Sequence, residues 1–188
     1  MKHFVAVLAL VISLASASQA QALRARIAHG PNVQSRGDLI VTVAGKDKTL
    51  ARDVRAFRVF DKGRTLLWIG FDGAGGFENE GQSLWRLDSA TGRSRKLLAE
   101  TYEIDAFQEA RGRSGRRVWV LTLGSGGLSW PHIHVIRDNG ESLWRQMDAQ
   151  LYAIKNGRVL LTLFHGDPET PGAPRRIVYR TIDALLHR

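Results

Sequence analysis

From residue 39 onward, short runs of β-branched, aromatic and aliphatic residues alternate with polar turns that contain glycine. Runs of about four to eight such residues are typical of strands, and turns such as Asp138-Asn139-Gly140 and Lys155-Asn156-Gly157 favour tight hairpins. Helical periodicity is hard to find before the last eight residues. The pattern predicts an antiparallel all-β domain, with strands at 39–43, 54–60, 65–71, 83–88, 94–99, 118–123, 133–137, 142–147, 151–154, 158–164 and 176–182.

Three segments share a Gly-Arg pair followed by an apolar strand. They begin at Gly63, Gly115 and Gly157, so the spacings are 52 and 42 residues, near the period of about 40 to 50 residues typical of four-stranded propeller blades. The hairpin at 84–97, with Asp88, Thr91 and Gly92 at its turn, resembles the outer hairpin of TolB-like and WD40-like β-propellers. This resemblance implies three to four propeller-like blades.

The number of strands leaves the architecture open. Three full blades with leading strands could close as a small four-bladed ring through residues 39–51, or remain a half-propeller that a partner completes. Open sheet edges also allow a homodimer by sheet-edge pairing. A β-sandwich or barrel fits the strand pattern nearly as well. The tetrapeptide Ser-Leu-Trp-Arg occurs at 83–86 and 142–145. The two copies fall on the third and the fourth strand of the proposed blades. Either the proposed blade register is therefore wrong or the repeated tetrapeptide is a coincidence.

The N-terminus is typical of an export signal. Lys2 precedes the apolar stretch Phe4–Leu14, which is too short for a bilayer span of about 18 residues, and small residues follow it. Cleavage after Ala20 or Ala22 satisfies the small-x-small rule, and we favour Ala22. The predicted organisation is therefore a signal peptide at 1–22 and a single all-β domain at 23–188, exported to the periplasm or secreted.

Composition and charge narrow the partners. The chain has no cysteine, which excludes disulfides and thiol catalysis and is ordinary for a bacterial periplasmic protein. It carries 27 Lys and Arg against 18 Asp and Glu, a balance that favours anionic envelope polymers, lipid surfaces or proteins as partners. Basic clusters lie at 93–96 and 111–117. Nucleic acid is not expected, because no nucleic-acid-binding motif is present, and no apolar run is long enough to span a membrane.

One long loop follows the second strand in each of the three proposed blades. These loops lie at 72–82, 124–132 and 165–174. In that register they emerge on one face, and loops presented by a rigid scaffold often carry function. Trp130 stands out because an indole in a Gly/Pro loop often marks a partner contact. The candidate binding residues are Trp130, Asp72, Glu78, Glu80, His165 and Asp167.

His132 and His134 form the sharpest local candidate for chemistry. Residues at i and i+2 of a strand point to one face, so both imidazoles could reach one transition metal ion. Gly126, His132, His134 and Asp138 together look like the first cupin motif, which implies a metal site with Asp138 or His165 as third ligand. The second cupin motif is absent, and Asp138 also suits a turn.

The sequence contains no nucleophile elbow, no phosphate-binding loop and no EF-hand. No cofactor is therefore expected beyond the single metal that the His pair could hold. The sequence favours an exported binding or scaffolding protein that contacts another envelope protein or an anionic envelope polymer through loops on one face. The alternative is a metal-dependent, cupin-like enzyme that uses His132 and His134.

Overall fold

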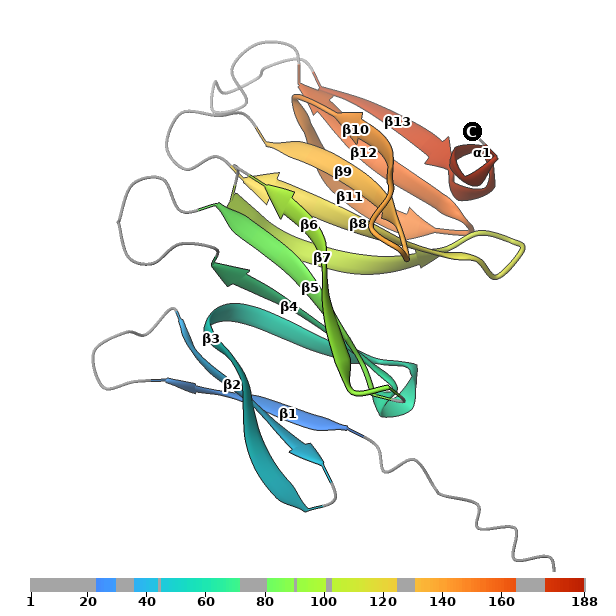
Figure 1. The fold of residues 1–188 in the computed structure, drawn as a ribbon. Coiled ribbons are helices and arrows are strands. Elements are labelled where there is room, and N and C mark those ends of the chain that lie inside the picture. Colours follow the sequence, from blue (N-terminus) through green and yellow to red (C-terminus); the bar gives the residue numbers. More distant parts are fainter. Residues whose placement is uncertain are drawn as a thin grey trace, which may run out of the picture.

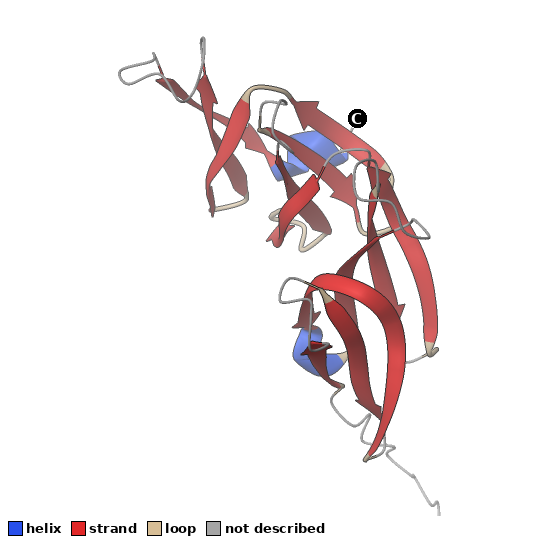
Figure 2. Cartoon of the chain, turned by 90° about the vertical axis from the view of Figure 1, so that its left-hand side faces the viewer, coloured by secondary structure: helices blue, strands red, loops and turns tan. Residues whose placement is uncertain are grey.

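The computed structural model describes residues 23–29, 36–43, 45–71, 81–89, 91–100, 103–124, 131–164 and 175–187. These residues form thirteen strands and two short helices, arranged in three antiparallel sheets that stack in an open arc (Figures 1 and 2). The predicted all-β class is confirmed. The predicted signal peptide at 1–22 lies outside the described residues.

The first sheet is a six-stranded meander that serves two packing units, which we call blade 1 and blade 2. Blade 1 comprises β1 (Arg24–His29), β2 (Gly37–Val43) and residues 46–53 of β3 (Lys46–Phe60). Blade 2 comprises residues 54–60 of β3, the short helix η1 (Asp61–Gly63), β4 (Thr65–Phe71), β5 (Gln82–Asp88) and β6 (Arg93–Glu100).

Two further sheets continue the arc. Blade 3 is a four-stranded meander of β7 (Glu103–Arg111), β8 (Arg117–Gly124), β9 (His132–Arg137) and β10 (Ser142–Gln146). Blade 4 contains β11 (Ala149–Lys155), β12 (Arg158–Phe164) and β13 (Arg175–Thr181), and the helix α1 (Ile182–Leu186) follows it. The three Gly-Arg pairs thus precede or begin β4, β8 and β12, the second strands of their blades.

Left-handed aspartates mark two of the passages between blades. Asp53 (φ 51°) lies where β3 changes partner from β2 to β4, and Asp148 (φ 52°) lies between β10 and β11. Aspartate tolerates the left-handed region better than β-branched residues. Each of these aspartates is followed by a fully buried residue, Val54 and Ala149 respectively. The chain therefore turns at these two aspartates, and the buried residue that follows each of them is the first core residue of the next blade.

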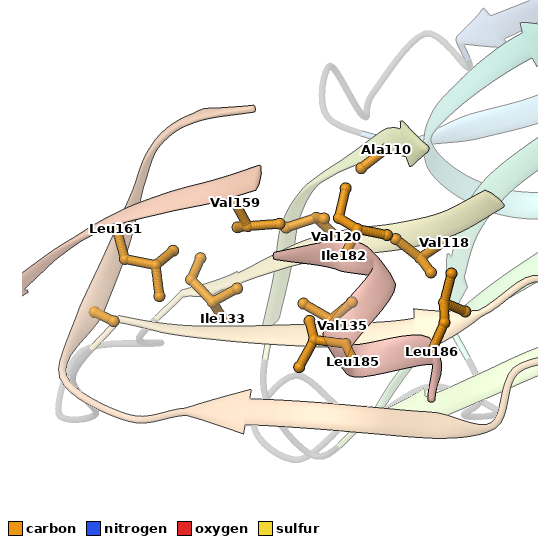
Figure 3. Close-up of a cluster of buried hydrophobic side chains, with 11 residues drawn as sticks. Ala110, Val118, Val120, Ile133, Val135, Val159, Leu161, Ile182, Leu185 and Leu186 are labelled. Carbon is orange, nitrogen blue, oxygen red and sulfur yellow. The ribbon is translucent and has the colours of Figure 1, made fainter. Parts of the chain in front are cut away.

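Three apolar layers hold the blades together. The layer between blades 3 and 4 is shown in Figure 3, where Val118 and Val120 of β8 face Val159 and Leu161 of β12 and the helix α1. Trp119 and Leu121 point to the other side of β8, into the layer between blades 2 and 3. A third layer joins blades 1 and 2. Strands β4 and β8 are thus apolar along nearly their whole length because each is covered on both faces.

The described strands do not close into a barrel or a ring of blades. Within the described part of the chain the three sheets remain separate, without the continuous ladder of a barrel. Residues 39–51 belong to blade 1, at the opposite end of the arc from blade 4 (Figure 1), so they do not complete a four-bladed ring. No described helix is long and apolar enough to cross a membrane.

Candidate functional site

The predicted loop residues lie outside the described residues. This holds for Trp130, Asp72, Glu78, Glu80, His165 and Asp167. The strand ends that flank their loops all lie on one side of the arc, on the left in Figure 1. The prediction that these residues bind a partner is untested.

The two predicted metal ligands are buried between blades 2 and 3. His132 and His134 are 0% and 2% exposed, and both lie on the face of β9 that points to blade 2. His134 Nδ1 lies 2.8 Å from Glu100 Oε1 of β6, and its Nε2 lies 2.8 Å from Ser142 Oγ of β10. Both ring nitrogens of His134 are thus engaged by protein groups. Among the residues that the structure describes, no group of three or more His, Asp or Glu could hold a metal.

Glu100 is the centre of this buried polar group. Its Oε1 also accepts a hydrogen bond of 2.5 Å from Arg145 of β10, and its side chain is only 5% exposed. Hydroxyl, imidazole and carboxylate follow one another as in hydrolase triads. Neither of the two pockets described below is lined by these groups, however. The arrangement ties the outer strands of blades 2 and 3 together through buried hydrogen bonds.

Asp138, the alternative third ligand, has a structural role at the turn between β9 and β10. Its carboxylate accepts hydrogen bonds from Arg86 Nη1 (2.6 Å), Arg117 Nε (3.0 Å) and Trp119 Nε1 (3.1 Å). Arg117 also bonds Asp61 at the start of blade 2's first turn. The same turn requires glycine at position 140, because φ is 92° and a Cβ there would collide with the carbonyl of Leu97. Asp138 therefore links blades 2 and 3 at their turn side.

The carboxyls of this network ionise more easily than usual. Burial on its own would raise the pKa of Asp138, but hydrogen bonds and charges from Arg117 and Arg86 outweigh it and lower the pKa below its ordinary value. The pKa of Asp61 is lowered in the same way by Arg117, Thr65 and Arg111 against the opposing effect of burial. The two aspartates are therefore anions at neutral pH and stay ionised to a lower pH than an ordinary aspartate.

We expect acid to weaken the folded state through these two groups. A carboxyl whose pKa is lower when folded stabilises the protein above its unfolded pKa of about 3.9, and this contribution disappears as the pH falls through the folded pKa. The free energy of unfolding, measured by urea titration between about pH 5 and pH 2, should fall more steeply in the natural chain than in Asp138→Asn. Equal slopes would contradict the network. Asp105, whose pKa is raised by burial and by Glu103, acts in the opposite direction in both proteins.

The outer face of blade 4 has a composition unlike that of an ordinary surface. Because side chains alternate along a strand, Val159 and Leu161 of β12 point into the core while Leu160 and Thr162 point away from it. In the register of β12 and β13, Leu160 pairs with Tyr179 and Thr162 with Ile177. Ile177 is 57% exposed and Tyr179 is 54% exposed. We call this surface, with Leu160, Ile177 and Tyr179 at its centre, the blade-4 outer face.

Basic side chains surround this apolar centre. The guanidinium of Arg158 lies 4.6 Å from the ring centroid of Tyr179, and that of Arg175 lies 5.7 Å from Phe164. At the turn end, a pocket of about 410 Å³ has Leu160 and Tyr179 in its wall together with Arg113, Lys155 and Arg158. The described residues that line it include no carboxylate. The surface therefore combines an apolar centre with basic side chains, and one of them, Arg113, also interacts with a carboxylate outside the lining, that of Asp183.

The blade at the other end of the arc differs. On the corresponding face of blade 1, Arg26 of β1 pairs with Asp47 of β3 at 3.1 Å, and Thr42 of β2 donates to the same carboxylate at 2.7 Å. Both charged side chains are more than half exposed. Blade 1 thus presents a mainly polar face that carries one ion pair, with the exposed Arg24 opposite Thr42 on the same face. The blade-4 outer face is the more apolar end of the arc. Sequence reasoning missed it, although the run Val159–Phe164 is as apolar as the doubly covered β4 and β8.

Comparisons with known proteins relate the chain to propellers by fold alone. No protein-family model matches it, and no curated protein is significantly similar to it in sequence. The β-propeller domain of the Trilobed protease from Pyrococcus furiosus, described as having an open velcro topology, superposes with a TM-score of 0.56 at 10% identity, covering 84% of this chain and 51% of that one.

Two peptidases give similar superpositions. An acylaminoacyl peptidase in complex with Z-Gly-Gly-Phe-chloromethyl ketone matches with a TM-score of 0.54 at 12% identity, over 86% of this chain and 31% of that one. The Pyrococcus horikoshii acylaminoacyl peptidase matches at 0.55 and 12%, over 83% and 29%. The chain therefore spans about half the length of the first of these proteins and less than a third of the peptidases. Its fold is propeller-like.

Proposed function

We propose that this chain is an exported, non-catalytic binding domain, an incomplete propeller that an envelope protein completes by packing on the blade-4 outer face. The observation that carries the proposal is the exposure of Ile177 and Tyr179 of β13 beside Leu160 of β12, a strand whose opposite side is buried through Val159 and Leu161. A propeller-like blade is normally covered on both faces, as β4 and β8 are here. The proposal includes that the blades are TolB-like or WD40-like and that the protein lies in the periplasm.

The charge of the surface indicates the chemistry of the partner. Arg113, Lys155 and Arg158 lie beside an apolar wall with no carboxylate in the lining. A partner segment that presents carboxylates around a central apolar side chain matches this distribution, because complementary charge guides association and an aromatic anchor supplies binding energy. The predicted partner contacts of Trp130 and the other loop residues are part of the same proposal.

A second copy of the chain is a poorer match. Two blade-4 outer faces packed about a twofold axis would bring their basic rims together. Edge pairing of β13 with its own copy about Val178 would set Arg176 opposite Arg180, and like charges directly opposite each other destabilise a sheet. Arginine on an edge strand is a known protection against self-pairing. The purified chain should therefore be a monomer.

Site-directed photo-crosslinking tests the proposal. A photoreactive phenylalanine analogue at position 179 should crosslink the full chain to one protein of discrete mass in cells, whereas the same analogue at Val43, which is 58% exposed on blade 1, should not. The unlabelled variant Tyr179→Asp should lose the partner while its free energy of unfolding changes by only about 0.5 kcal/mol, as at other surface sites. Crosslinks from position 43 but none from position 179 would contradict the proposal.

A further inference from the structure

Three turns and the C-terminal helix converge on a second pocket, distinct from the blade-4 outer face. It has a volume of about 520 Å³ and lies at the short turns of blades 2 and 3 (Figure 1). These turns are at the opposite end of the strands from the ends that flank the long loops. Five arginines line it, and they come from both basic clusters of the sequence and from β9: Arg95, Arg111, Arg116, Arg117 and Arg137. We call this site the arginine pocket.

Three of these arginines are already neutralised by carboxylates. Arg117 bonds both Asp61 and Asp138, the two acidic residues of the lining. Arg111 bonds Asp61 at 3.2 Å and also Glu109, and Arg137 lies 3.0 Å from Glu141. These ion pairs fix the inner wall of the pocket and hold its arginines in place.

The remaining two arginines are not neutralised within the described part of the chain. Arg95 donates a hydrogen bond of 2.9 Å to the backbone carbonyl of Asp138 and has no carboxylate partner there. The side chain of Arg116 is exposed and has no ion pair or hydrogen bond to another described residue, although its backbone carbonyl accepts a hydrogen bond from the Gly112 N–H. With Arg86, which also bonds Asp138, six guanidinium groups face four carboxylates. The pocket carries an excess of about two positive charges.

A phosphate group fits this excess better than a carboxylate. A phosphate monoester carries about −1.5 to −2 charges at pH 7 and offers three strong acceptor oxygens, whereas a carboxylate offers one charge and two oxygens. Arginine presents donors in a planar fork that matches phosphate oxygens in pairs. Arg95 comes from blade 2 and Arg116 from blade 3, so a bound phosphate would receive donors from two elements that the Asp138 network already holds together.

We propose that the arginine pocket is a phosphate-binding site, which takes a terminal phosphate or diphosphate group of an envelope lipid or of a soluble ligand. Arg95 and Arg116 provide the direct contacts, and Arg117 with Asp61 and Asp138 forms the fixed wall behind them. The site does not depend on the blade-4 outer face, so it remains testable whether or not a protein partner binds there.

Calorimetric titration of the purified mature chain with pyrophosphate and with inorganic phosphate tests the site. The double variant Arg95→Gln, Arg116→Gln should weaken binding by about tenfold or more, because it removes the charge-assisted donors. The control is Arg52→Gln, Arg58→Gln, which removes the same charge from exposed positions of β3 outside the pocket and should change affinity by less than about threefold. Binding should also weaken steeply with added salt.

Vesicles identify the source of the phosphate. Flotation with phosphatidic acid vesicles that is lost only in the pocket variant assigns the site to a lipid headgroup, and calorimetric binding without flotation assigns it to a soluble ligand. The single variant Arg116→Gln guards against a folding defect, since the Arg116 side chain makes no hydrogen bond to a described residue and the backbone hydrogen bond from Gly112 stays in place. Absence of binding to every probe, or an equal loss in the pocket and control variants, would overturn the proposal.

Discussion

Asp138→Ala should destabilise the protein by about 3 kcal/mol, the lower end of the range for breaking a buried ion pair, because the Asp138 side chain is itself 37% exposed. The side chains of Arg86 and Arg117 are only 15% and 10% exposed, and both lose a carboxylate in this variant. The indole Nε1 of Trp119, a fully buried residue, loses its acceptor as well. Equilibrium urea unfolding of the variant and of the natural chain measures the difference.

The neighbouring residue Glu141 provides the matched control. It belongs to the same turn and pairs with Arg137, but its side chain is 57% exposed. Exposed pairs contribute about 0 to 1 kcal/mol, so Glu141→Ala should have little effect. Asp138→Asn, which keeps an oxygen acceptor but removes the charge, should lie between the two. Similar losses for Asp138→Ala and Glu141→Ala would contradict the role of Asp138 as the link between blades 2 and 3.

Glu100→Ala should have a comparably large effect, also about 3 kcal/mol. The carboxylate of Glu100 is 5% exposed and contacts both His134, itself 2% exposed, and Arg145. Its removal leaves the buried imidazole without its carboxylate partner and removes the contact between β6 and β10. Thermal or urea unfolding measures the loss.

Two further variants identify the cause of that loss. Glu100→Gln keeps the shape and one oxygen acceptor, so it should recover part of the stability. Ser142→Ala removes the hydroxyl at the other ring nitrogen of His134, on the exposed side of the site, and should cost less. A stability that is unchanged in Glu100→Ala would show that the buried group does not hold the two blades together.

Most of the strands could be predicted from the sequence because runs such as Thr65–Phe71 are buried on both faces and therefore apolar throughout. Strand β7 was missed for a physical reason. Ile104 and Phe107 share a face although they are three apart, because a register shift between Ile104 and Ala106 interrupts the alternation of two, and the buried Ala110 points to the other face. Strand β1 was missed because arginines occupy its outer positions. The copies of Ser-Leu-Trp-Arg do lie on different strands, β5 and β10.

The sites were harder to predict than the strands. The spacing of His132 and His134 indicated correctly that they share a face, but it could not indicate that Glu100, 34 residues away from His134, meets one of them. The role of Asp138 depends on Arg86 and Arg117, which a local motif does not reveal. The apolar residues of the blade-4 outer face, Leu160, Ile177 and Tyr179, are visible in the sequence. That no further blade covers them became clear only from the structure, in which blade 4 lies at one end of the arc.

The asymmetry between the two ends of the arc is the main functional consequence of the fold. Blade 1 ends in a mainly polar surface that carries the Arg26–Asp47 ion pair, whereas blade 4 ends in an apolar centre with a basic rim. This difference suits a domain that binds one partner, because only the blade-4 end offers an apolar surface for packing. Because the two ends do not match, copies of the chain are not expected to stack end to end.

We propose that a partner covers the blade-4 outer face, and hydroxyl-radical footprinting of Tyr179 tests this most directly. Oxidation of Tyr179 is compared between the purified chain and the same full-length chain in intact cells, with Met147, which is 44% exposed in the turn before blade 4, as internal reference. We expect Tyr179 to react readily in the purified chain and to be strongly protected in cells, while Met147 reacts alike in both. Equal oxidation of Tyr179 in the two settings would contradict the account.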